Sequence, residues 1–153
     1  MPFNTVLLAD VELDKPQPIP LGTYVFALAP GSQYRESKFN TDAQGNSTQE
    51  LNVRFVIAEG ELAGKGAFVS YPDPTVTSAK GKSMAWSAQA LKKLEIALGV
   101  DALAGEDPAT YLNRVASNHA ARITASIVKD RYIKEGETEP RPVFGIWSVG
   151  PAA

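Results

Sequence analysis

The chain has 153 residues, of which 44% are hydrophobic and 21% are charged, a composition typical of one soluble globular domain with a substantial core. The formal net charge of −2 excludes a strongly basic protein that holds nucleic acid through a global positive field. The absence of cysteine excludes disulfides and thiolate metal sites, and the single histidine, His119, gives no basis for a catalytic triad or a histidine-rich metal site within one chain.

The N-terminal region is predicted to be an extended segment covering residues 1–19. Three prolines between residues 15 and 22 disfavour a helix there. The start lacks the basic residues of a signal peptide, and no apolar run in the chain is long enough to span a membrane. We therefore expect a single domain, 1–153, without a membrane partner.

The first strand is predicted at residues 23–29, because TYVFALA begins with aromatic and β-branched side chains. Residues 30–49 are predicted to form a long polar loop, in which DAQGNS is a favourable turn. A polar loop of this length is usually functional or mobile. Its YRESKF stretch, residues 34–39, combines two rings with two cations and is the leading candidate for a ligand contact.

Two further strands are predicted at residues 51–57 and 67–71, joined by a glycine-containing turn. Apolar and polar side chains alternate in the first of these strands, so that Phe55 lies on a buried face and Arg54 on the opposite face. The turn, GELAGKG, is not a phosphate-binding loop, because its spacing is wrong and no Ser or Thr follows Lys65.

Two helices are predicted after these strands. The first, within MAWSAQALKKLEIALG, has Ser83 as its N-cap and Gly99 as its stop signal, and its apolar face places Trp86 in the core. The second lies within residues 105–118, with Asp107 as its N-cap and a proline in its first turn.

The last two strands are predicted at residues 121–133 and 143–149, with a polar loop at 134–142 between them. The fold is therefore mainly β with one or two helices. About five strands, with a helix inserted after the third, is the element order of an OB-fold-like five-stranded antiparallel barrel. Another small antiparallel barrel or an α+β sandwich is the alternative.

The chain also resembles a family of bacteriophage-encoded proteins in the order and spacing of several segments. These segments are PLGTYVFALAP, ELNVRFVIAEGELAGKGAFVSY and SAQALKKLEIALGV, within residues 20 to 147. The positions that match the family pattern look structural, and they are Gly22, Tyr24, Gly60, Gly64, Lys65, Phe68, Leu94 and Gly99. Members of that family look like OB-fold single-stranded DNA-binding proteins of phage replication and recombination.

The resemblance implies sequence-independent binding of single-stranded DNA in the cytoplasm of a bacterial host, with no cofactor. Further copies of this chain, and phage replication or recombination proteins, are candidate partners. The C-terminal VFGIWSVGPAA departs from common single-stranded DNA-binding proteins, because it is not an acidic tail of the kind that recruits partners. The oligomeric state and the preference between DNA and RNA are left open.

Single-stranded nucleic acid is held by cations that contact phosphates and by rings that stack on bases. The candidate contacts are side chains of these two kinds outside the predicted buried faces. They are Tyr34, Arg35, Lys38, Phe39, Arg54, Lys65, Tyr71, Lys80, Lys82, Arg122, Lys129, Arg131, Tyr132 and Lys134. The last four lie where an OB barrel has one of its binding loops. Arg141 and Trp147 are weaker candidates.

A phage structural protein, or another protein-interaction β-barrel without nucleic-acid binding, is the second hypothesis. The near-neutral charge and the apolar C-terminus favour it, because an exposed Trp147 could anchor an interface with another chain. An enzyme is the least favoured class, since the chain has one histidine, no cysteine and no pair of acids spaced for acid–base catalysis or metal binding.

Overall fold

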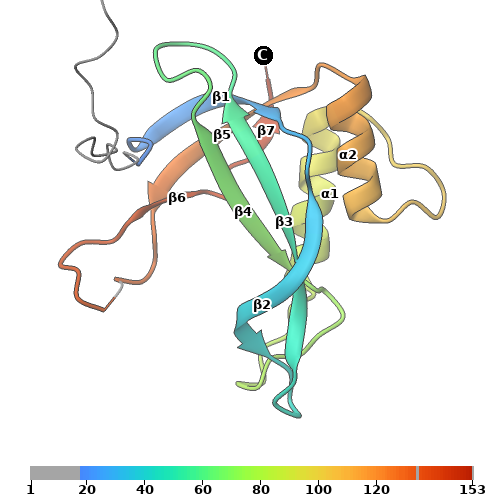
Figure 1. The fold of residues 1–153 in the computed structure, drawn as a ribbon, viewed down its shortest axis with the longest axis vertical. Helices are drawn as coiled ribbons and strands as arrows, with labels where there is room; N and C mark the ends of the chain where they lie inside the picture. Colours follow the sequence, from blue (N-terminus) through green and yellow to red (C-terminus); the bar gives the residue numbers. More distant parts are fainter. Residues whose placement is uncertain (1–17, 134, 153) are drawn as a thin grey trace, which may run out of the picture.

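The computed structural model describes residues 18–133 and 135–152, apart from the side chains of residues 38–40. This part of the chain has a mainly β fold, an antiparallel sheet of seven strands with two helices (Figure 1). In chain order the elements are β1 (Gly22–Leu28), β2 (Gln33–Thr41), β3 (Ser47–Ile57), β4 (Gly66–Pro72), α1 (Trp86–Leu98), α2 (Pro108–Asn118), β5 (Arg122–Lys129), β6 (Pro142–Phe144) and β7 (Gly150–Pro151). No helix among the described residues is long and apolar enough to cross a membrane.

Strand β3 is the centre of the sheet, because it is paired along both edges. One edge pairs with β2 and, further along, with β1, while the other edge pairs with β4. Strand β1 extends the sheet to β5, which in turn pairs with β6 and β7. Within the described residues no hydrogen-bonded ladder joins β4 to β6, so the sheet is not closed into a barrel.

The alternation predicted for β3 is confirmed. The four apolar side chains on its core face, Leu51, Val53, Phe55 and Ile57, are at most 3% exposed, whereas Arg54 is exposed on the opposite face. The Phe55 ring stacks on the ring of Phe144 in β6, with centroids 4.9 Å apart and an interplanar angle of 2°. Aromatic packing therefore attaches β6 to the core although β6 is not paired with β4.

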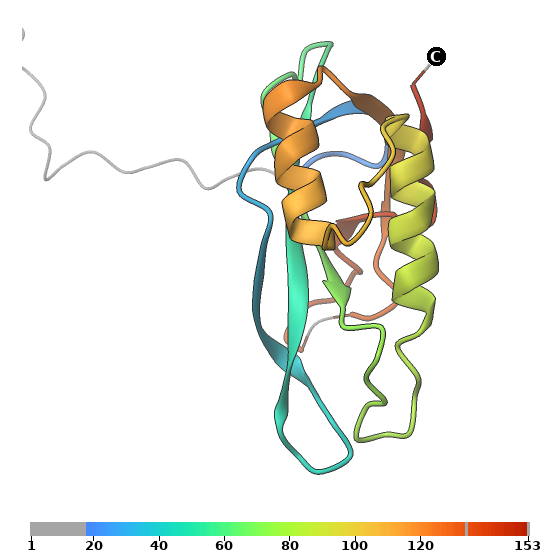
Figure 2. The ribbon, with the colours of Figure 1, turned by 90° about the vertical axis from the view of Figure 1, so that its right-hand side faces the viewer.

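The two helices lie side by side and cover one side of the sheet (Figure 2). The prediction for the end of α1 is confirmed, since Gly99 has a φ of 72°, a left-handed conformation that costs glycine little. The prediction for the start of α2 is also confirmed, because the Asp107 side chain accepts a hydrogen bond from the Thr110 N–H. Ser83 is not the N-cap of α1; Ala85 holds that position without a side-chain bond.

The predicted loop at residues 30–49 is wrong, because strand β2 occupies Gln33–Thr41 and β3 begins at Ser47. Strand β2 lies at the edge of the sheet and pairs only with β3 among the described strands. An edge strand with little buried surface needs no apolar alternation, so its polar sequence gave no strand signal. The helices consequently follow the fourth strand of the chain, not the third.

The predicted last strand at residues 143–149 is also wrong, because β6 ends at Phe144, a turn follows, and β7 begins only at Gly150. Within this turn the Ser148 N–H donates to the carbonyl of Gly145 at 2.9 Å. A Cβ at Gly145 would lie 2.9 Å from the Ser148 Oγ and 3.0 Å from the Ser126 carbonyl oxygen, so this turn requires glycine. The preceding strand, predicted to reach residue 133, ends at Lys129.

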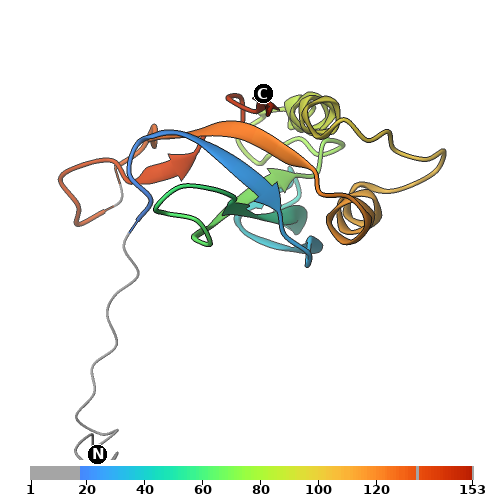
Figure 3. The ribbon, with the colours of Figure 1, turned by 90° about the horizontal axis from the view of Figure 1, so that it is seen from above.

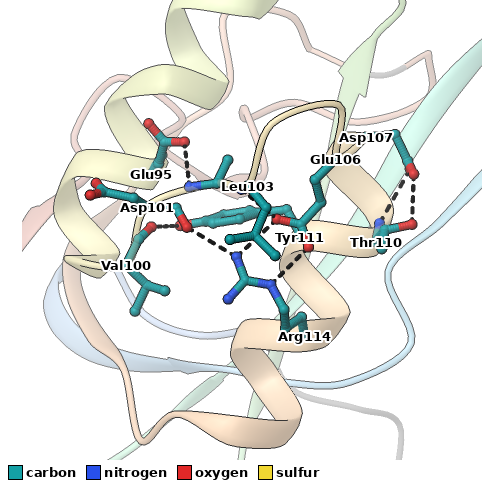
Figure 4. A network of polar contacts seen from close by, with 10 residues as sticks. Glu95, Val100, Asp101, Leu103, Glu106, Asp107, Thr110, Tyr111 and Arg114 are labelled. Atoms are coloured by element: carbon teal, nitrogen blue, oxygen red, sulfur yellow. Dashed lines mark hydrogen bonds and ion pairs between the residues drawn. The ribbon is translucent and has the colours of Figure 1, made fainter.

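Polar contacts hold the connection between α1 and α2 in place (Figure 4). Arg114 donates through Nε to Glu106 at 2.7 Å and through Nη2 to the Asp101 carbonyl at 3.0 Å. The Tyr111 hydroxyl donates to the carbonyl of Val100. Hydrogen bonding to Arg114 lowers the pKa of Glu106, and burial raises the pKa of Tyr111 to about 12. The two helices are thus fixed relative to each other by a structured connection.

Asp107 makes stability depend on pH. Hydrogen bonds from Thr110 and from the Tyr34 hydroxyl lower the pKa of Asp107 from 3.8 to about 2. The ionised carboxylate therefore stabilises the fold above its ordinary pKa, and this contribution is lost as the pH falls through about 2.

We expect Asp107→Ala to lower the thermal unfolding midpoint at neutral pH, as measured by circular dichroism. The difference from the parent protein should shrink as the pH falls from about 4 to about 2. Asp107→Asn, which keeps an acceptor, should lose less; a deficit independent of pH would contradict this role.

Candidate nucleic-acid interface

A groove of about 1030 Å³ opens where the end of β4, the start of α1 and the segments after β5 and β6 come together. We call it the aromatic groove. It is lined by Glu50, Ser70, Pro72, Lys82, Ser83, Met84, Trp86, Arg131, Tyr132, Ile146 and Trp147. Three of these residues are aromatic and two are cationic, the combination that single-stranded nucleic acid requires.

The three rings of the aromatic groove are exposed to solvent. Trp86 is 38% exposed, Trp147 is 49% exposed and Tyr132 is 71% exposed. The rings of Trp86 and Trp147 are neighbours, with centroids 6.0 Å apart and planes tilted by 50°. Large aromatic side chains gain free energy by burial, so a group of exposed rings indicates a surface that binds something.

The turn between β6 and β7 positions Trp147. Ser148 fastens this turn to β5, because the Ser126 N–H donates to the Ser148 Oγ at 2.8 Å and the Gly145 N–H donates to the Ser126 carbonyl at 2.8 Å. The Lys93 ammonium of α1 donates to the Trp147 carbonyl oxygen. The indole is therefore presented from a backbone that is held on both sides.

Two connecting segments supply the cations of the aromatic groove. In the connection between β4 and α1, the Ser78 N–H donates to the Lys82 carbonyl at 2.8 Å, which fixes the Lys82 backbone at the end of a turn over residues 78–82. In the loop after β5, the Asp130 N–H donates to the Arg141 carbonyl at 2.8 Å and closes the base of the loop. That loop extends away from α2 (Figure 3). The backbone of Arg131 is therefore held in place by the hydrogen bond of the preceding residue, Asp130.

The charges around the aromatic groove favour an anion. Neither Lys82 nor Arg131 takes part in any ion pair found in the described part of the chain. The acid in the lining, Glu50, is paired with Arg35, whose Nε lies 2.8 Å from Oε1. The local charge is therefore positive although the whole chain is slightly acidic.

The outer face of β3 and β4 carries another exposed ring. Phe68 is 64% exposed and lies opposite Arg54 across the two strands. The Arg54 guanidinium carbon is 5.9 Å from the centroid of the Phe68 ring, within the range of a cation–π contact. Ser70, two residues along β4 on the same face, belongs to the aromatic groove. This face therefore continues the groove along the strands.

Of the residues predicted as contacts, the structure brings Lys82, Arg131 and Tyr132 together in the aromatic groove. Arg54 lies on the adjoining outer face. Lys65 is exposed beside Phe68, where both line a separate gap of about 440 Å³ between β4 and β6. Three of these five predicted contacts therefore lie in the aromatic groove, while Arg54 lies on β3 and Lys65 lies just before the start of β4.

Two of the predicted aromatic contacts have structural roles. Tyr71 is 1% exposed, so its ring packs in the core and cannot stack on a base; burial raises its pKa. The Tyr34 hydroxyl donates to Asp107 at 2.8 Å and accepts from the Ala109 N–H at 3.3 Å, which ties β2 to the start of α2. Burial, reinforced by Asp107, raises the pKa of Tyr34.

The remaining predicted cations are not in the aromatic groove. Arg35 is engaged by Glu50, and Arg122 lies 3.6 Å from Glu59. Lys80 and Lys129 are exposed, but neither lines the groove. The predictions for Lys38, Phe39 and Lys134 fall outside the described side chains.

Sequence reasoning placed Trp86 in the core and did not select Phe68 as a ligand contact. Trp86 is the first residue of α1, and the buried face of the helix begins at the next residue, Ser87, which is 0% exposed, so the indole lies beside that face and not on it. Phe68 alternates with Ala67 and Val69, which are buried, and this pattern in the sequence would have predicted that the Phe68 ring lies on the outer face.

Comparisons with known proteins give no further assignment: no protein-family model matches the chain, and no curated protein matches it either. The geometry of the aromatic groove and of the β3–β4 outer face therefore carries the functional argument.

The structural role of Tyr34 can be separated from ligand binding. We expect Tyr34→Phe, which keeps the ring and removes the hydroxyl, to lower the free energy of unfolding by about 1 kcal/mol in urea denaturation. Affinity for a single strand should not change, because the ring points to α2 and lies outside the aromatic groove. Weaker binding without a loss of stability would instead make Tyr34 a ligand contact.

Proposed function

We propose that this protein binds single-stranded DNA with little dependence on sequence. The observation that carries the proposal is the aromatic groove, in which three exposed rings lie beside Lys82 and Arg131. Bases would stack on the rings and phosphates would contact the two cations. Stacking contributes about 1–3 kcal/mol per base, so a few rings give useful affinity without a global positive charge.

The topology of the sheet supports an OB-fold-like, partly open barrel as the framework of this site. Strand β3 pairs with β1, β2 and β4, and both helices lie in the connection between β4 and β5. In OB folds, oligonucleotides bind on one face of the barrel and through two of its loops. The aromatic groove adjoins the outer face of β4 and includes the loop after β5, which agrees with that mode. The resemblance to phage single-stranded DNA-binding proteins supports the same function.

Salt dependence tests the proposal. We expect a fluorescently labelled single strand of ~30 nucleotides to bind in an anisotropy titration, with affinity falling as salt rises. Two to four phosphate contacts predict a slope of about −1.4 to −2.8 in a plot of log K against log salt. The matching duplex should bind far more weakly, because its bases are stacked internally. Flat titrations with both ligands would refute DNA binding.

Tyr132 offers the sharpest single substitution. Its ring is 71% exposed, so Tyr132→Ala should leave the thermal midpoint unchanged. If the ring stacks on a base, the affinity for a single strand should fall by about 1–3 kcal/mol. Leu103→Ala, which truncates a 61% exposed side chain in the connection between the helices, is the matched control and should bind like the parent protein. Equal affinities of all three proteins would remove Tyr132 from the site.

A protein-interaction module, such as a phage structural component, is the second candidate. The neighbouring exposed indoles of Trp86 and Trp147 favour it, because tryptophan is common at the centre of protein interfaces. The cations beside the indoles, which form no ion pair with the described residues, favour nucleic acid over this alternative. Co-purification with virions, together with no response to any oligonucleotide, would reverse the order.

A further inference from the structure

We propose that Glu50 biases the aromatic groove towards bases that carry an exocyclic amino group. This inference rests on the proposed function, since it concerns base recognition in the same groove. Cytosine presents an amino donor at the position where uracil and thymine present a keto oxygen. A carboxylate beside that edge accepts from the amino group and repels the keto oxygen.

Glu50 is a fixed acceptor in the lining of the groove. Its side chain is only 11% exposed, and the residue lies in β3 between Arg35 of β2 and Pro72 of β4. Carboxylates are seldom this buried unless they are paired. The hydrogen bond from Arg35 Nε to Oε1, 2.8 Å long, meets that requirement and sets the direction of the carboxylate. An ionised carboxylate has acceptor capacity for more than one hydrogen bond.

The donors next to Glu50 are engaged within the sheet. Besides its bond to Glu50, Arg35 donates through Nη2 to the Ser70 Oγ at 3.4 Å. Asn52 Nδ2 donates to the same oxygen at 3.5 Å. Neither Arg35 nor Asn52 lines the aromatic groove, whereas Glu50 does. The charged group that the strands present to a ligand there is therefore an acceptor.

The arrangement of charges directs the edge of a base towards Glu50. The three rings come from α1 and from the segments after β5 and β6, whereas Glu50 comes from β3 on the strand side. A phosphate close to Glu50 would be repelled, while one close to Lys82 or Arg131 is attracted. A strand bound in the groove therefore places its phosphates towards those cations and the edges of stacked bases towards β3.

The test compares oligo-dC with oligo-dU of ~12 nucleotides at about pH 8, where both bases are neutral. The bases of the two strands differ in their hydrogen-bond donors and acceptors, and neither base carries the methyl group of thymine. One hydrogen bond of the ordinary net size, about 1 kcal/mol, predicts about fivefold tighter binding of oligo-dC. An oligo-dC strand whose N4 atoms are dimethylated has lost these donors and should bind like oligo-dU.

Glu50→Gln should bring the two affinities to within about twofold, because the amide can donate to the keto oxygen of uracil. Glu36→Gln is the matched control, since Glu36 is an exposed acid on β2 that does not line the groove, and it should keep the preference. Tight but equal binding of dC, dU and dimethylated dC by the parent protein would overturn this inference alone. Failure of the parent protein to bind any of the strands would overturn the proposed function as well. The parent measurements decide the question even if Glu50→Gln does not fold.

Discussion

Strand β3 is the constraint on which both the core and the proposed binding surface depend. It is hydrogen-bonded along both edges, so its side chains have only two directions available. Val53 and Phe55 point into the core, and Arg54 between them points outward. A shift of one residue in register would exchange these faces completely. The burial of its apolar side chains therefore fixes which polar and aromatic groups the sheet presents to solvent.

The aromatic groove is built around this sheet by segments without regular structure. A glycine turn holds Trp147, a hydrogen-bonded turn ends at Lys82, and an anchored loop carries Arg131. Each of these segments is fastened to a strand, a helix or its own base by backbone hydrogen bonds. The site consequently combines defined positions with exposed rings. The proposed ligand, a strand with flat bases and a negative backbone, would use both the exposed rings and the cations of this surface.

Elements with a buried face could be predicted from the sequence, and elements without one could not. The alternation of residues 51–57, the glycine that ends α1 and the Asp107 cap of α2 are all local signals that the structure confirms. Strand β2 could not be predicted, because its sequence is polar and carries no apolar alternation. Backbone pairing with β3 is what makes it a strand. The aromatic groove joins residues from 50 to 147 of the chain. Such a site depends on tertiary packing, and the sequence indicates only Lys82, Arg131 and Tyr132 as main candidates among its members, with Trp147 as a weaker one.

Quenching of tryptophan fluorescence tests the central claim most directly, because the two tryptophans of the chain, Trp86 and Trp147, both line the aromatic groove. Stacking of bases on these indoles predicts saturable quenching by a single strand, with the midpoint moving to higher concentration as salt increases. The duplex should quench much less at the same nucleotide concentration. Binding detected by anisotropy without any change in tryptophan emission would place the strand elsewhere on the protein and contradict the account.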